Sequence, residues 1–273
     1  MTTPAQDTAS PAPGDILFEE DGVRLDVRDE TATVTLTNPA KRNAQTPALW
    51  RALARAGREL PGSVRIVVLR GEGQSFSAGL DRRAFTPEGF PGDISFFTLA
   101  KAPEAELDAT IAFYQEAFTW WRRPDLVSVA VVQGHAIGAG FQLALACDLR
   151  VCAEDARFAM RETSLGLVPD LTGTSPLVGL VGYGRALEIC ATGRYVDAAE
   201  AARIGLANLV VPADALDAAV TEFTTALLAA PRNAVNETKA LLQGAVHRPF
   251  DEQRAAERQA QGRRLRELMG DGE

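Results

Sequence analysis

The segment Val127-Ser128-Val129-Ala130-Val131-Val132-Gln133-Gly134-His135-Ala136-Ile137-Gly138-Ala139-Gly140-Phe141-Gln142 decides the fold of this chain. It runs from an apolar, β-branched stretch through glycines into a helix-like segment at 140–147, so it predicts strand, glycine loop and helix. Glycine lets a ligand approach the backbone closely, and the first N–H groups of a helix have no intrahelical partner. Two such donors aimed at one oxygen form an oxyanion hole, which stabilises negative charge on a carbonyl.

A second glycine loop has the same setting earlier in the chain. Ser77-Ala78-Gly79-Leu80-Asp81 follows the short apolar run Ile66-Val67-Val68-Leu69, which predicts a buried strand. The intervening Gly71-Glu72-Gly73 is similar to the start of a dinucleotide fingerprint, but Phe76 stands where the third glycine is needed. The two loops therefore indicate a backbone site for a carbonyl oxygen and argue against a nicotinamide site.

The order of the remaining elements predicts an α/β core followed by a mostly helical part after Thr174. Apolar or alternating runs predict further strands at 16–20, 23–27, 32–36, 149–152 and 207–211. Helical periodicity predicts helices at 46–60, 104–121, 175–181, 184–192, 197–204, 213–229, 232–244 and 251–268. We divide the chain into a disordered tail (1–14), an α/β core that holds the site (15–205) and a helical C-terminal region (206–273).

Composition and charge exclude several classes of function. The chain has 273 residues, of which 46% are hydrophobic and 23% charged, as in soluble globular proteins. Its net charge of −8 argues against nucleic-acid binding, and no apolar stretch has the length of a membrane span. Three cysteines without CxxC spacing and two histidines argue against a metal site and suit the cytoplasm. Neither a phosphate-binding P-loop nor a GxSxG nucleophile motif occurs.

Two carboxylates in a stretch with few other charges are candidates for acid–base chemistry. Glu162 follows the apolar segment Phe158-Ala159-Met160, and Asp170 comes shortly after it. A carboxylate near apolar walls has a raised pKa and becomes a better base toward a carbon acid. The alternative is a structural role for these acids, as a helix cap or in an ion pair with Arg161. His135 is expected to pack beneath the glycine loop, because no serine or cysteine has a nucleophile context.

Five motifs in order resemble the crotonase (enoyl-CoA hydratase/isomerase) superfamily, and the likeness covers about residues 15 to 245. They are the segments 38–44, 71–81, 134–140, 146–150 and 201–211. The resemblance implies an α/β fold, a spiral of ββα units with a helical C-terminal region that forms trimers. It also implies an acyl-CoA thioester substrate, no metal, and no cofactor beyond the coenzyme A of the substrate. The expected assembly is a homotrimer or a dimer of trimers.

The resemblance also implies site residues by position. The oxyanion hole would consist of the N–H groups of Leu80 and Ala139. Coenzyme A would contact Lys41, Arg42, Ala78, Gly79, Leu80, Asp81 and Gly138, with Arg82 or Arg83 as further candidates for its phosphates. Each of these cations has the alternative role of a solvated surface charge.

Three positions bear on the reaction. Family hydratases hold and activate water with two glutamates, which map onto Glu162 and Gln142. A glutamine orients water but cannot take its proton at neutral pH. Asp170 lies where dienoyl-CoA isomerases carry an aspartate. We therefore expect isomerisation of a 3-enoyl or 3,5-dienoyl thioester, with Glu162 as the base at C2 and Asp170 as the distal acid for a dienoyl substrate. Hydration of a 2-enoyl-CoA, thioester hydrolysis, decarboxylation and a catalytically silent coenzyme A-binding protein remain alternatives.

Overall fold

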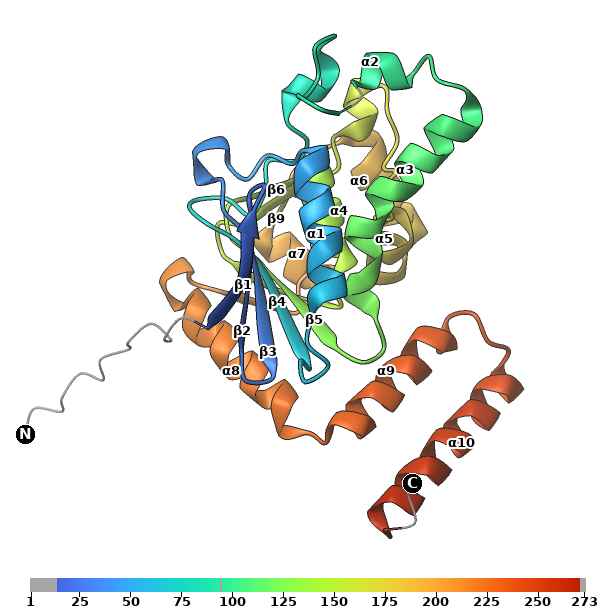
Figure 1. The fold of residues 1–273 in the computed structure, drawn as a ribbon. Helices are drawn as coiled ribbons and strands as arrows, with labels where there is room; N and C mark the ends of the chain where they lie inside the picture. The colour runs from blue at the N-terminus through green and yellow to red at the C-terminus, as the bar shows by residue number, and fades with distance from the viewer. Residues whose placement is uncertain (1–13, 94, 271–273) are drawn as a thin grey trace, which may run out of the picture.

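The computed structural model describes residues 14–93 and 95–270 (Figure 1). The predicted tail, apart from Gly14, lies outside the described residues. Of the chain that is described, seven strands form one sheet in the order β1-β2-β3-β4-β5-β7-β10. Their bounds are β1 Asp15–Glu20, β2 Val23–Arg28, β3 Thr31–Leu36, β4 Ile66–Gly71, β5 Val127–Val132, β7 Leu149–Ala153 and β10 Leu209–Val211.

The sheet is antiparallel at its start and parallel from β3 onward. Such a sheet is buried on both faces, which explains why β4 and β5 are continuous apolar runs. Val67 and Leu69 of β4 join the main core, whereas Ile66 and Val68 join a second apolar cluster on the other face. The last strand, β10, lies within residues 206–273, the predicted helical C-terminal region. The first part of that region therefore belongs to the large sheet.

Helices cover both faces of this sheet (Figure 1). The α-helices are α1 Pro47–Glu59, α2 Phe96–Leu99, α3 Glu104–Thr119, α4 Ala139–Ala146, α5 Thr174–Val181, α6 Tyr183–Thr192, α7 Ala198–Arg203, α8 Leu216–Ala229, α9 Arg232–Ala245 and α10 Phe250–Leu268. Short 3₁₀ turns are η1 Pro39–Lys41, η2 Arg82–Phe85, η3 Trp120–Arg122, η4 Glu162–Leu165 and η5 Ala213–Ala215. The helix over 46–60 begins as its sequence predicts, because the Thr46 hydroxyl caps the N–H of Leu49 at 3.1 Å.

A small second sheet determines where the site lies. It consists of β6 His135–Ile137, β8 Arg157–Ala159 and β9 Val196–Asp197. Only Gln133 and Gly134 separate β5 from β6, so the chain leaves the large sheet and enters the small one within two residues. The strand β6 then leads directly into α4 through Gly138, and this turn forms the second glycine loop.

The C-terminal helices α9 and α10 extend away from the core (Figure 1). One buried cation attaches α9 to the rest of the chain. The Lys239 ammonium donates to the Leu126 carbonyl oxygen at 2.7 Å and to the Asp148 carboxylate at 2.7 Å. A buried charge must be paired to be tolerated, so this contact fixes where the helix pair leaves the core. In the described part of the chain, no helix is long and apolar enough to cross a membrane.

Candidate active site

The first glycine loop leaves one backbone donor free. Most backbone donors of this loop have an acceptor at 2.8 to 3.2 Å. Phe76, Ser77 and Ala78 donate to the carbonyl oxygens of Gln133, His135 and Arg42, in that order. Gly79 donates to the Ser77 hydroxyl, and Asp81 donates to the Gln45 carbonyl oxygen. The N–H of Leu80 has no acceptor among the described residues. Since buried backbone groups are almost always paired, this unpaired donor marks a position where a ligand oxygen would bind.

The second loop leaves a donor free at the start of α4. The Ile137 N–H donates to the Ser77 carbonyl oxygen at 3.0 Å, and the Gly138 N–H donates to the Ala159 carbonyl oxygen at 2.8 Å. Ala139 is the first residue of α4, so its N–H has no intrahelical acceptor. Leu80 and Ala139, the two positions that the resemblance implies for the oxyanion hole, thus both carry an N–H without an acceptor among the described residues.

Close contact between the loops brings these donors together. A β-carbon on Gly79 would overlap the Ile137 carbonyl oxygen and lie 3.5 Å from the Ala139 nitrogen. Gly79 also has a φ of +83°, a value that residues with side chains rarely adopt. Glycine at this position therefore lets the loop that carries Leu80 approach the loop that carries the Ala139 nitrogen.

Glu162 places a carboxylate beside these donors. A β-carbon on Gly138 would lie 3.3 Å from Glu162 Oε1. Oε1 accepts a hydrogen bond from Gln142 Nε2 at 2.7 Å, while Oε2 is buried and has no partner among the described residues. Burial raises the pKa of Glu162, the charge of Asp170 raises it further, and the Gln142 hydrogen bond partly opposes this. Arg161 instead lies 4.9 Å over the Tyr195 ring, so an ion pair does not account for Glu162.

Gln142 connects Glu162 to the segment after Asp170. The Gln142 side chain is buried, and its Oε1 accepts from the N–H groups of Leu171 at 2.9 Å and Gly173 at 3.3 Å. With Nε2 bound to Glu162, both ends of the amide are occupied by protein. Gln142 therefore orients the base and this segment, and its oxygen is not free to hold a water.

Asp170 directly precedes the segment that Gln142 binds, and its negative charge raises the pKa of Glu162. Its carbonyl oxygen accepts a hydrogen bond from Gln115 Nε2 on α3 at 2.6 Å. The residue is exposed in the single chain, yet the protein atoms around its carboxyl group raise its pKa. The segment 170–173 is thus held from α3 on one side and from α4 on the other.

Most of the predicted coenzyme residues line one cleft of about 380 Å³. Its lining residues are Lys41, Ala44, Ala78, Leu80, Asp81, Arg82 and Arg83. Asp81 pairs with Arg83 at 2.9 Å and with Lys41 at 3.8 Å, and the Arg83 hydrogen bond lowers the pKa of Asp81. Gly79 and Gly138 lie in the adjoining loops. The structure therefore brings together the side chains of Lys41, Arg82 and Arg83 with Leu80, and it adds Ala44, which was not among the predicted coenzyme residues.

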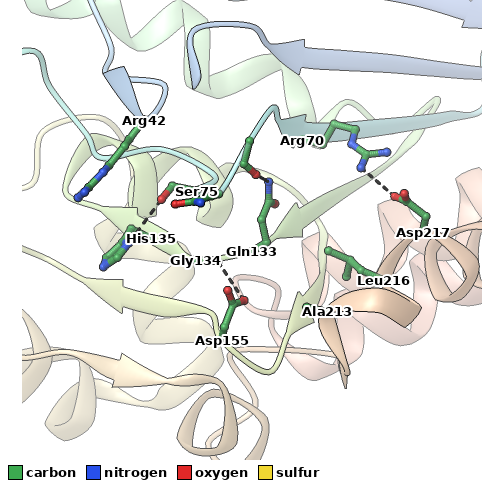
Figure 2. A pocket seen from close by; sticks show the side chains of 12 residues that line it. Arg42, Arg70, Ser75, Gln133, Gly134, His135, Asp155, Ala213, Leu216 and Asp217 are labelled. Atoms are coloured by element: carbon green, nitrogen blue, oxygen red, sulfur yellow. Dashed lines mark hydrogen bonds and ion pairs between the residues drawn. The ribbon is translucent and has the colours of Figure 1, made fainter. Parts of the chain in front are cut away.

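Arg42 is the exception, because it lines a different cleft of about 620 Å³ (Figure 2). There it lies near His135, and the Ser75 hydroxyl lies 3.4 Å from His135 Nδ1. Arg70 and Asp217 pair at 2.8 Å in the same cleft, and Asp155 accepts from the Gly134 N–H at 3.1 Å. Arg42 and Lys41 are neighbours in sequence but line separate clefts. His135 is half-buried, and its carbonyl oxygen supports the first loop through the Ser77 N–H.

Two backbone N–H groups without an acceptor among the described residues thus lie in loops next to Glu162, whose Oε2 is buried and has no partner among those residues. Such an arrangement suits the removal of a proton next to a carbonyl. Residues 27–268 match the family model described as enoyl-CoA hydratase/isomerase, and the chain belongs to this family, with the crotonase fold.

Individual relatives agree with this assignment. A Thermobifida fusca protein solved in complex with acetoacetyl-CoA is 51% identical, over 90% of this chain and 95% of that one, with a TM-score of 0.87. A Mycobacterium leprae protein named "Probable enoyl-CoA hydratase" is 30% identical, over 85% of this chain and 83% of its own length. A mitochondrial Delta(3,5)-Delta(2,4)-dienoyl-CoA isomerase of Dictyostelium discoideum is 30% identical, over 70% of this chain and 65% of its own length.

Proposed function

We propose that this enzyme moves a double bond in an acyl-CoA thioester, converting a 3-enoyl into a 2-enoyl, or a 3,5-dienoyl into a 2,4-dienoyl thioester. The observation that carries this proposal is the buried Glu162 Oε2, which has no partner among the described residues and belongs to a carboxylate beside the free Ala139 donor. A buried carboxylate oxygen without a partner costs folding free energy, which indicates a functional role. We assign it the removal of a proton from a substrate carbon.

The reaction would proceed by proton transfer without the addition of water. Glu162 takes a proton from C2, the electron pair of that C–H bond forms a C1=C2 double bond, and the π electrons of the carbonyl move onto the thioester oxygen. The product is a dienolate from a 3-enoyl substrate and a trienolate from a 3,5-dienoyl substrate. The N–H groups of Leu80 and Ala139 stabilise the oxygen as its charge develops. A proton that has exchanged with solvent is then delivered to C4 of a monoene, or by Asp170 to C6 of a dienoyl substrate, and the electrons move back to re-form the carbonyl.

The engagement of Gln142 supports isomerisation over hydration. Hydration needs a second group to hold or activate a water, and the amide at this position is bonded to Glu162, Leu171 and Gly173. Asp170, whose pKa is raised by burial of its carboxyl group, suits proton delivery to a distal carbon. Isomerisation occurs among relatives of this chain, since they include a protein named as a dienoyl-CoA isomerase as well as proteins named as hydratases.

The coenzyme portion of the substrate would occupy the cleft lined by Lys41, Arg82 and Arg83. Cationic side chains suit phosphates, and exposed backbone around Ala78 and Leu80 suits an adenine edge. The relative solved with acetoacetyl-CoA supports a thioester substrate for this chain as well. Leu80 links the two regions, since it lines the coenzyme cleft and carries one oxyanion donor.

Turnover of two substrates tests the role of Asp170. The wild-type enzyme should convert 3-enoyl-CoA, 3,5-dienoyl-CoA or both into conjugated products, followed by ultraviolet absorbance. If the dienoyl thioester is turned over, Asp170→Asn should slow it about 10²-fold by removing the distal acid, with a much smaller effect on the monoene. Equal losses on both substrates would contradict the distal-acid role. Inactivity on both, combined with hydration of 2-enoyl-CoA, would contradict isomerisation.

The pH dependence should report the raised pKa of Glu162. Because only the deprotonated carboxylate takes a proton, kcat/KM should fall as the pH drops through that raised pKa. Gln142→Leu removes a hydrogen bond that lowers this pKa, so the acidic limb should move to higher pH. Gln243→Leu, on α9, is the matched control and should leave the limb in place. An acidic limb at the ordinary pKa of an exposed glutamate, or one that Gln142→Leu does not move, would contradict this assignment.

Assembly as a homotrimer or a dimer of trimers is part of the proposal. The C-terminal helices and the turn between them expose large apolar side chains, with Leu242 at 67%, Val246 at 78% and Phe250 at 77% exposure. Apolar surface of this kind favours an interface. Light scattering after size exclusion should give about three or six times the 29.2 kDa chain mass. Val246→Asp should lower that mass, and a monomeric wild type would contradict the proposal.

A further inference from the structure

We infer that Gln45 is a positioning residue for the oxyanion hole, because it fixes the direction in which the Leu80 N–H points. This inference rests on the proposed function, which gives Leu80 its role as a donor. Gln45 was not among the residues that the sequence indicated for the site. It is fully buried just before α1, and it contacts the first glycine loop through both its backbone and its side chain.

The backbone contact determines the orientation of Leu80. The Gln45 N–H donates to the Gly79 carbonyl oxygen at 2.7 Å, and the Asp81 N–H donates to the Gln45 carbonyl oxygen at 2.8 Å. These two bonds form an isolated parallel bridge between Gln45 and Leu80. In a parallel ladder, a residue whose two neighbours bond to one partner directs its own N–H and C=O away from that partner. The Leu80 N–H therefore points away from Gln45.

The side chain of Gln45 connects this bridge to a rigid helix. Its Oε1 accepts from Trp50 Nε1 of α1 at 2.7 Å, and its Nε2 donates to the Ser77 hydroxyl at 3.2 Å. That hydroxyl donates to the Asn43 carbonyl oxygen at 2.8 Å and accepts from the Gly79 N–H at 3.2 Å. Both Gln45 and Ser77 have 0% exposure. A chain of buried hydrogen bonds thus runs from α1 to the residue before Leu80.

Such a network matters because an oxyanion donor acts only when it is held in place before the charge develops. Removing the Gln45 amide leaves the Trp50 indole N–H without its acceptor and the Ser77 hydroxyl without one of its donors. Buried groups left unpaired in this way seek new partners, which displaces the neighbouring backbone. We expect the loop to remain folded but the Leu80 N–H to point less accurately toward the thioester oxygen of the substrate.

The test is the infrared stretch of a thioester carbonyl, labelled with ¹³C at C1, in an acyl-CoA bound to the enzyme. In the wild type, hydrogen bonds from the oxyanion hole should shift this band to lower frequency on binding. Gln45→Met should reduce the shift and lower kcat at least about tenfold, with KM changed far less. Gln243→Met, which removes a glutamine bonded to the Arg122 carbonyl oxygen on the distant α9, should match the wild type.

Ser77→Ala provides a second variant with a smaller change in volume, for the case in which Gln45→Met folds poorly. It interrupts the same chain of hydrogen bonds and should also reduce the carbonyl shift. An undiminished shift in either folded variant would overturn the inference and leave the oxyanion hole intact. A wild-type band that does not move on binding would overturn the oxyanion hole itself, and with it the basis of the proposed function.

Discussion

Glu162→Gln is expected to lower kcat for isomerisation by about 10²–10⁴-fold, the range that a positioned general base contributes. The change keeps the size of the side chain, and the new amide oxygen accepts the same hydrogen bond from Gln142 Nε2. Only the ability to take a proton from C2 is lost. The effect is large because Glu162 Oε2 is the atom proposed to take that proton. This oxygen has no protein partner among the described residues.

Two measurements separate the loss of the base from general damage. Binding of coenzyme A should be retained, since the cleft lined by Lys41 and Arg83 is not altered. Glu222→Gln on α8, an exposed glutamate, is the matched control and should retain wild-type turnover. If Glu162→Gln kept more than about a tenth of wild-type turnover, Glu162 would not be the general base.

Ala139→Pro should lower kcat by about 10²–10³-fold, the cost of losing one oxyanion donor. Proline has no N–H, and it is tolerated at the first position of a helix, where the N–H has no intrahelical partner. Ala139 occupies that position in α4. The substitution therefore deletes one donor while the helix itself remains compatible with proline.

The control for this variant is Ala139→Ser, which restores the N–H at the same site with a small side chain. It should recover most of the turnover that the proline variant lacks. Circular dichroism and urea unfolding would establish that both variants are folded. Equal turnover in the proline and serine variants would mean that the Ala139 N–H does not stabilise the reacting oxygen.

The large sheet and most helices follow from local sequence signals. The Thr46-Pro47 start predicted the helix that the structure places at Pro47–Glu59, and the run 127–132 matches β5. The second sheet was not predicted. Its strands β6, β8 and β9 have two or three residues each, which is too short for alternation to distinguish them from loops. Their pairing depends on the packing of distant segments instead.

The site also combines features with local sequence signals and features that depend on the packing of distant segments. The glycines and the start of a helix have local signatures, so the loop sequences indicated a backbone site, whereas the donors Leu80 and Ala139 were implied by the family resemblance. The engagement of Gln142 was not predictable, since its partners Glu162, Leu171 and Gly173 come together only in the fold. The cleft that the Arg42 side chain lines was not predictable either. Arg42 has a left-handed backbone conformation, with a φ of +50°. Its side chain lines the cleft of Figure 2, whereas its neighbour Lys41 lines the other cleft.

Mass spectrometry in heavy water distinguishes isomerisation from hydration. The enzyme would be incubated in D₂O with 2-enoyl-, 3-enoyl- and 3,5-dienoyl-CoA, and each product weighed. Isomerisation through Glu162 predicts a product that gains deuterium on carbon without the mass of an added water. Glu162→Gln should abolish that labelling. A product heavier by one D₂O, formed from 2-enoyl-CoA while the other two thioesters stay unchanged, would mean hydration and would contradict this account.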